Sequence, residues 1–462
     1  MPSASQPRPR HGFGVARRVP AGLSPWVMTY PRTLALAALL TAAVPVWAAA
    51  PPLPTPGGDL VALYKDLHSH PELSLQETRS AAIMAAEARK AGFAVTEKVG
   101  GTGVVAVMVN GAGPTLLIRA DMDALPVKEM TGLPFASRAT GLLPDGSSSA
   151  VMHACGHDIH MTVWSGVARA MAAARDKWSG TLVMITQPAE ENVGGAKAMI
   201  KDGLFTRFPR PDYALALHDN STMPAGQVSV PPDRALAASN SVNIEVKGIG
   251  GHGAYPYTTK DPIVLAARIV GALQTLVSRE NDPFKPAVVT VGAFNGGNRN
   301  NIIPDGVKMQ LTVRSYDAEQ QQRLIDGIGR IARGEAIAAG IPEAMMPVIT
   351  VDGGTEVTRN SVDLAARVRA TLVKALGTGR VVDREPSMAG EDFNQFNLAD
   401  PRIATTIFWL GGVPQAQWDA AQKGGPAIPS LHNSGWAPDP GPTIATGVEA
   451  MTAAAIDLLA KK

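Results

Sequence analysis

The densest group of side chains that could do chemistry is the segment Met152–His160, with the sequence MHACGHDIH. It holds three of the nine histidines and the only cysteine, Cys155. Thiolate and imidazole groups are good ligands for zinc-like ions, so Cys155 and His157 could bind a metal. Cys155 could instead be a nucleophile with His153 or His157 as its base, or an inert buried thiol among helix-capping histidines. This segment alone leaves these interpretations open.

Two pairs of acidic residues extend the argument. Glu190 and Glu191 are adjacent, and such carboxylates are usually exposed because they repel each other. At a metal site, one could bind the ion while the other accepts a proton from bound water. Asp121 and Asp123 would point to the same side of an extended strand. One of them could orient a ligand histidine, or both could lie in a surface turn before Pro126.

Three of the six histidines outside that segment are further candidates. His218 follows an apolar run and His432 lies in a loop sequence, SLHN. Each alone is more often structural, but their expected places at a strand end and in a loop make them reasonable distant ligands. His252 stands among glycines, which expose the imidazole and allow close approach of the backbone. It could belong to a mobile domain that completes the site, or to a tight turn.

Strands that alternate with helices must position these residues. The predicted strands are 104–109, 115–120, 181–186 and 213–217, and the predicted helices are 59–65, 77–91 and 161–175. This alternation predicts an α/β fold, with a mainly parallel sheet covered by helices on both faces. Functional residues gather at the carboxyl ends of such strands, and Asp121, Glu190 and His218 each follow one.

From about Ala237 the pattern changes to the order β-α-β-β-α-β. This order predicts a ferredoxin-like α+β domain inserted into the first, which we expect over residues 237–353 as a lid and a possible dimerisation domain. The catalytic domain would then consist of residues 51–236 and 354–462.

The first 50 residues predict an extension and an export signal. Residues 1–33 are rich in Pro, Arg and Ser and are expected to be disordered. Arg32 precedes the apolar run Leu34–Trp47, and small residues follow it, which is the order of a secretory signal. The run is shorter than the ~20 residues of a membrane span and contains Pro45, so cleavage is favoured over anchoring. Met28 is an alternative start.

Export would change two other interpretations. Residues 1–48 carry five Arg and no acidic residue, so their removal changes the formal charge from +2 to −3. No basic stripe remains to indicate a nucleic-acid partner. We expect a periplasmic or secreted protein with no stable membrane span after cleavage. In an oxidising compartment cysteines usually pair, so the lone Cys155 is an inert thiol, half of an intermolecular disulfide, a nucleophile or a metal ligand.

Several stretches together resemble the co-catalytic metallopeptidase/aminoacylase superfamily. The closer resemblance is to its amidohydrolase branch of hippurate hydrolases, indole-acetyl-amino-acid hydrolases and N-acetyl-diaminopimelate deacetylases. The supporting stretches follow the family's order over about residues 60–435: Leu67–Leu73, Arg119–Pro126, Met152–His160, Gln187–Glu191, Gly194–Lys197, Gly250–His252, Asn301–Asp305 and Gly390–Phe393.

The resemblance implies a zinc-exopeptidase-like fold and two divalent ions, zinc or manganese. The implied ligands are Cys155, His157, Glu191, His218 and His432. It further implies that Glu190 is the general base and that Asp123 orients the cluster. His252 would reach in from the lid to polarise the scissile carbonyl, and Asn301 and Arg314 would hold substrate. With these roles, the single cysteine is expected to hold metal.

One feature of this branch and one departure from the pattern of close relatives bear on the site. Asp121 stands where other branches carry a ligand histidine, so it is not taken as a ligand. Tyr257 replaces a histidine that close relatives usually carry in the turn after His252, which would alter the polarity of the lid.

The resulting prediction is a metal-dependent hydrolase of N-acyl amino acids, such as hippurate-like, N-acetyl or aryl-acyl conjugates. Water activated by metal and by Glu190 would release a carboxylate and a free amino acid. The alternatives are a dipeptidase or carboxypeptidase on the same fold, a metal- or peptide-binding protein without turnover, and an unrelated cysteine hydrolase. A homodimer through the inserted domain is also expected.

Overall fold

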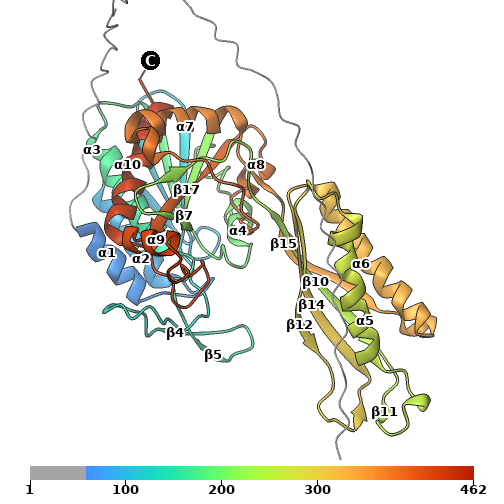
Figure 1. Ribbon diagram of the computed structural model, residues 1–462. Helices are drawn as coiled ribbons and strands as arrows, with labels where there is room; N and C mark the ends of the chain where they lie inside the picture. Colours follow the sequence, from blue (N-terminus) through green and yellow to red (C-terminus); the bar gives the residue numbers. More distant parts are fainter. Residues whose placement is uncertain (1–58, 462) are drawn as a thin grey trace, which may run out of the picture. The chain divides into compact units, whose positions relative to one another are not determined.

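The computed structural model describes residues 59–461, which Figure 1 colours along the chain. The predicted disordered extension 1–33, the predicted export signal up to residue 50 and the alternative start at Met28 lie outside the described residues. All described residues belong to one structural unit.

A seven-stranded sheet organises the larger part of the chain, in the order β1-β2-β6-β3-β7-β17-β8. The strands are β1 Ala94–Glu97, β2 Val104–Asn110, β3 Thr115–Asp121, β6 Gly180–Gln187, β7 Tyr213–Pro224, β8 Val228–Ser229 and β17 Ala404–Val413. Strands β6, β3, β7 and β17 run parallel, and the remaining pairs are antiparallel. The predicted α/β class is confirmed, with a sheet that is mixed because antiparallel pairs flank its parallel centre.

Helices cover both faces of this sheet. One apolar core includes residues of α1 Asp59–Ser69, α2 Thr78–Lys90, α3 His157–Ala173, α7 Val362–Leu376 and α10 Pro440–Leu458. The core on the other face includes residues of α4 Gly195–Lys201 and α8 Gln395–Ala399. Along β3, Leu116 and Ile118 enter the first core and Leu117 the second, because successive side chains of a strand point to opposite faces. Strands buried on both faces are expected to be apolar, as β3 is from Leu116 to Ile118, before its buried charged residues Arg119 and Asp121.

A second, four-stranded antiparallel sheet follows in the order β12-β14-β10-β15. Its elements are β10 Ala238–Lys247, α5 Pro262–Thr275, β12 Ala287–Asn295, β14 Gly306–Ser315, α6 Ala318–Ala338 and β15 Val348–Thr355. Both helices pack on this sheet around a core of their own, as the β-α-β-β-α-β pattern predicts. The limits of the inserted domain, 237 and 353, stay a prediction.

The remaining elements are short. They are β4 Thr140–Leu142, β5 Ser148–Ala150, β9 Arg234–Leu236, β11 Gly251–His252, β13 Ile302–Ile303, β16 Thr358–Arg359, α9 Gln415–Gln422, and the helical turns η1 Pro256–Thr258, η2 Leu276–Glu280, η3 Glu343–Met345 and η4 Thr378–Arg380.

One helical stretch in the described residues, Pro262–Glu280, is long and apolar enough to cross a membrane by length and composition alone. This is weak evidence for a span, because core helices pass the same test. Leu265, Ile269 and Leu273 of this stretch are buried in the core of the four-stranded sheet.

Candidate metal centre and active site

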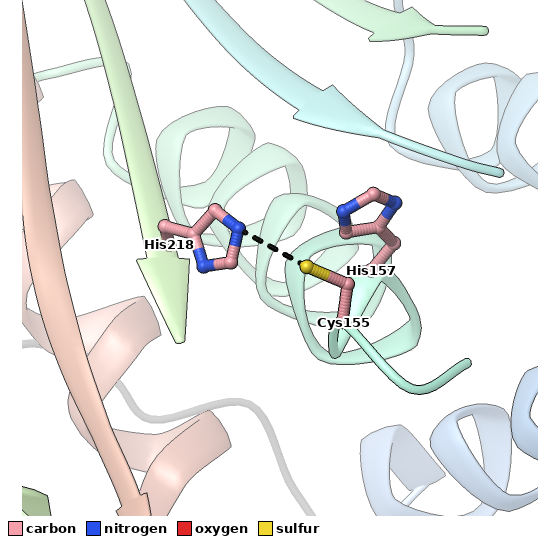
Figure 2. Close-up of side chains that lie close together, drawn as sticks. All are labelled: Cys155, His157 and His218. Carbon is pink, nitrogen blue, oxygen red and sulfur yellow. Dashed lines mark hydrogen bonds between the residues drawn. The ribbon is translucent and has the colours of Figure 1, made fainter. Parts of the chain in front are cut away.

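The five predicted metal ligands lie together around Cys155. Its Sγ is 3.6 Å from Nε2 of His218 and 3.2 Å from Nε2 of His432, and Figure 2 shows the thiol between His218 and His157. Oε1 of Glu191 is 3.4 Å from the same nitrogen of His432. Ligand atoms of Cys155, His157 and His218 lie within 4.8 Å of one another, as do those of Cys155, Glu191 and His432. Residues 277 positions apart thus meet at one point.

Local backbone geometry brings the ligands to this point. His157 opens α3 because Gly156, the preceding residue, has φ 78°. A Cβ at Gly156 would lie 2.4 Å from the carboxylate of Asp219, so only glycine fits there. His218 lies in β7, whereas His432 lies in a loop with φ 65°, a conformation that costs a residue other than glycine about 1–3 kcal/mol. Such strain is often held at functional sites.

Two imidazoles have a fixed tautomer that suits a metal. Nδ1 of His157 donates to the backbone carbonyl of Asp123 at 2.7 Å, because a carbonyl oxygen can only accept. Nδ1 of His218 donates in the same way to the carbonyl of Asp219 at 2.8 Å. In the neutral form of each ring, Nε2 then carries the lone pair, which is how metal-ligating histidines are oriented. The Nε2 of His157 is buried with no hydrogen-bond partner in the described residues, and so is Oε1 of Glu191.

The electrostatics of the cluster also favour a cation. Burial raises the pKa of the Cys155 thiol well above its usual value, and the charge of Glu191 raises it further. Burial likewise raises the pKa of Glu190, with the charges of Glu391 and Glu191 adding to it. Burial thus destabilises the anionic forms of both Cys155 and Glu190, which a bound cation would stabilise. The donor set of thiol, imidazole and carboxylate, with orphaned lone pairs, fits divalent metal ions.

The burial and charges around Cys155 weigh against its being an activated nucleophile. A nucleophilic cysteine needs a lowered pKa, and the environment of Cys155 raises it. His153, one of its proposed bases, is buried with neither ring nitrogen hydrogen-bonded among the described residues. Burial lowers the pKa of His153 to about 4.

Asp123 holds the two adjacent glutamates in place. Its Oδ1 accepts a hydrogen bond from the backbone N–H of Glu190, and its Oδ2 accepts one from Glu191, both at 3.0 Å. Ser74 Oγ donates to the same Oδ2 at 2.6 Å. Ala189, just before this pair, has φ 49°, and its N–H donates to a side-chain oxygen of Glu77 at 2.8 Å. Asp123 thereby fixes the backbone that carries Glu190 and Glu191, which fits its predicted orienting role.

Glu190 lies beside the ligands. Its carboxylate is buried, with Oε2 4.0 Å from Nε2 of His157. Among the described residues, this contact with His157 places the Glu190 carboxylate close to the centre. Its role as general base stays a prediction.

A buried network behind the centre contains residues that sequence reasoning did not assign. His160 Nδ1 lies 2.5 Å from Asp121 Oδ1, and His160 Nε2 accepts the backbone N–H of Asp219 at 2.9 Å. Asp121 Oδ2 lies 3.7 Å from His157 Nε2 and accepts from Arg119 at 2.6 Å. Burial opposes ionisation of Asp121, but the charges of Arg119 and His157 hold its pKa well below the usual range.

Arg119 is the only guanidinium at the centre of this network among the described residues. It is fully buried and donates to Asp121, to Glu391 at 2.8 Å and to Asp392 at 3.3 Å. Its Nε donates to Gln187 Oε1 at 3.0 Å, at the end of β6. Arg119 thus connects the strand ends that carry the candidate site to the segment around Glu391.

We expect Arg119→Met to lower the free energy of unfolding by about 3–5 kcal/mol, because removing one partner leaves buried carboxylates uncompensated. Chemical denaturation of the purified protein would measure this. Arg402→Gln is the control, because its guanidinium forms an exposed ion pair with Asp400 and should matter far less. Equal losses in the two variants would contradict the structural importance of Arg119.

Two predicted site residues are not brought to the centre. His252 is exposed in β11, where its Nδ1 accepts from the backbone N–H of Ala254 at 3.0 Å. Asn301 is exposed nearby, and its carbonyl accepts from Gly253 at 2.9 Å. Within the described chain, neither residue lines the cavity at the cluster. Their roles in polarising the carbonyl and in holding substrate stay predictions.

A cavity of about 660 Å³ opens onto the cluster, a size that suits a small ligand. Cys155, Glu190, Glu191, His218 and His432 line it on the metal side. Arg314, the other predicted substrate-binding residue, also lines it.

Comparison with known proteins decides the family. The family model described as Peptidase family M20/M25/M40 matches residues 117–422. The chain belongs to this family. It is therefore a hydrolase that acts on amide bonds and depends on divalent metal ions, and the resemblance stated from its motifs is confirmed.

Relatives of this M20/M25/M40 hydrolase are named for different activities. A hippurate hydrolase from Campylobacter jejuni is 38% identical over 343 residues, which is 73% of this chain and 85% of the relative. Thermostable carboxypeptidase 1 from Saccharolobus solfataricus is 34% identical over 356 residues, which is 76% of this chain and 85% of the relative. The solved structure of Bacillus subtilis YXEP, described as a dinuclear metal-binding peptidase from the M20 family, aligns with TM-score 0.67 and 26% identity over 87% of this chain and 98% of that one.

Proposed function

We propose that this protein hydrolyses the amide bond of N-acyl amino acids and releases a carboxylate and a free amino acid. One observation carries the proposal: a cavity large enough for a small amide opens onto five converging metal-ligand side chains with Glu190 beside them. The similarity to a hippurate hydrolase, whose substrate is an N-acyl amino acid, supports this substrate class.

We further propose that two zinc or manganese ions are held by Cys155, His157, Glu191, His218 and His432. When bound, such ions supply Lewis-acid polarisation of a carbonyl and lower the pKa of water. The dinuclear metal-binding relative supports two ions per chain.

The chain's own residues would perform the proton transfers and the positioning. Glu190 accepts a proton as the water oxygen attacks the amide carbonyl carbon, and it delivers that proton to the nitrogen as the C–N bond breaks. Asp123 holds Glu190 in position by accepting a hydrogen bond from the backbone N–H of Glu190. Arg314, on the cavity wall, provides a guanidinium for the carboxylate of the amino-acid part.

A carboxypeptidase or dipeptidase is the second candidate function, favoured by the similarity to a carboxypeptidase of comparable identity. Both candidates need the same metal centre and a group that binds a terminal carboxylate. They differ in whether the residue before the scissile bond carries a free amine.

We also propose export to the periplasm or the medium, on the apolar run Leu34–Trp47 and the small residues after it. In an oxidising compartment, binding to metal would protect the lone thiol of Cys155. A homodimer through the inserted domain stays a prediction.

We expect chelation to reduce hydrolysis of N-acetyl and N-benzoyl amino acids by roughly 100-fold or more, because bound metal supplies several kcal/mol of transition-state stabilisation. Elemental analysis should find about two ions per chain before chelation, and added zinc or manganese should restore activity. Faster hydrolysis of dipeptides than of acyl amino acids would favour the second candidate. Activity that survives chelation but is lost on alkylation would overturn both.

A further inference from the structure

The cavity that opens onto the metal ligands is also lined by two arginines. Besides Arg314 it is lined by Arg384, from the segment that precedes Gly390. No carboxylate lies within 4.0 Å of either guanidinium among the described residues, whereas most other arginines there form ion pairs. Two unpaired guanidinium groups in one small cavity therefore remain available to anionic groups of a ligand.

Arg314 is held in place by neutral acceptors. Its Nη1 donates to the backbone carbonyl of Met388 at 2.7 Å, and its Nε donates to Thr312 Oγ1 at 3.2 Å. Burial lowers the pKa of Arg314, as expected for a half-buried guanidinium with no anionic partner. The bond to Met388 also ties this arginine to the segment that carries Arg384.

Arg384 is held in place by an aromatic ring. Its guanidinium carbon lies 5.8 Å from the ring centre of Trp418, a distance at which a cation interacts with an aromatic face. Its Nε is buried and has no hydrogen-bond partner in the described part of the chain. Glu385, the adjacent residue, also lines the cavity, but it is exposed and forms no ion pair with Arg384 among the described residues.

We propose that Arg384 is a specificity-determining residue that binds a second carboxylate of the substrate, while Arg314 binds the α-carboxylate. The preferred substrates would then be N-acyl derivatives of acidic amino acids. This inference rests on the proposed hydrolysis of N-acyl amino acids. Guanidinium groups suit this role because they bind carboxylates through two parallel hydrogen bonds, and because an arginine already held near an aromatic ring loses less freedom on binding.

The substrate pair N-benzoyl-L-glutamate and N-benzoyl-L-glutamine tests the proposal on the metal-loaded enzyme. The two compounds have nearly the same size, and only the first carries the second charge. We expect kcat/KM to be roughly 10- to 100-fold higher for the glutamate compound, the effect of one hydrogen-bonded charged contact. In Arg384→Gln this ratio should fall to about one, and in Arg384→Lys it should lie between the two values.

Arg369→Gln is the matched control. Arg369 pairs with Asp383, beside Arg384 in the chain, and does not line the cavity. Its substitution removes one positive charge near the same segment and should leave the wild-type ratio intact.

The outcomes separate this inference from the proposed function. Equal kcat/KM for the two compounds in the wild type would overturn the inference and leave the proposed function standing, and this measurement needs no variant to fold. A wild-type ratio retained in Arg384→Gln would overturn the assignment to Arg384. Absence of hydrolysis of these compounds, of N-benzoylglycine and of N-acetyl amino acids would overturn the proposed function and the inference together.

Discussion

Glu190→Gln is expected to lower kcat by roughly 10²- to 10⁴-fold, the usual contribution of a positioned general base. Glutamine has the same shape and keeps the backbone N–H that donates to Asp123, so the local fold should persist. It cannot accept and return a proton at neutral pH. Metal content should stay at the wild-type value, because Glu190 is not among the predicted ligands.

Glu191→Gln is the matched control, since it makes the same chemical change at the adjacent residue. Oε1 of Glu191 is buried without a hydrogen-bond partner in the described chain and lies 3.4 Å from Nε2 of His432, so we expect this variant to lose metal. Steady-state kinetics and elemental analysis of both variants would separate the two roles. A Glu190→Gln enzyme with near-wild-type kcat would refute the general-base role, whatever its metal content.

The sequence predicted the residues that local chemistry makes unusual. Cys155 with His157 stands out because the chain's only thiol lies between histidines, and Glu190 with Glu191 stands out because two adjacent carboxylates near a buried strand end are costly to bury without a cation. Parallel strands bring their carboxyl ends to one edge, so the meeting of His218 with the glutamates could also be predicted. His432 gave a weaker signal, because a loop histidine with φ 65° has no periodic pattern, and the family resemblance was needed to name it as a ligand.

The network behind the centre could not be predicted in the same way. Arg119 pairs with Glu391, 272 residues away, and charged residues are normally expected at the surface. Nothing in the local pattern identifies such a pair. His160 gave a weak signal, since it lies three residues after His157 and thus on the same side of α3. That helix starts at His157 and not near Met161 as the sequence indicated, because Gly156 takes a conformation that ordinary residues disfavour.

Cys155→Ser is expected to reduce both metal content and turnover. A serine hydroxyl remains protonated at neutral pH and is a poor ligand for zinc-like ions, whereas a thiol becomes a thiolate when it binds metal. Loss of an outer-sphere partner alone costs about 10- to 100-fold in metal affinity, so loss of a ligand should cost at least as much. Metal per chain after dialysis against a buffered chelator, measured alongside kcat, would show the change.

The same variant separates the interpretations of the single cysteine. If Cys155 holds metal, its sulfur should resist alkylation while ions are bound between it and the nearby His218 and His432. After chelation the sulfur is no longer coordinated, so it should react more readily than in the metal-loaded enzyme. A nucleophilic Cys155 would behave differently: the serine variant would keep its metal and lose turnover, and alkylation would inactivate the metal-loaded enzyme. Unchanged metal content with unchanged turnover would leave Cys155 as an inert buried thiol, and the centre would then rest on the histidines and Glu191 alone.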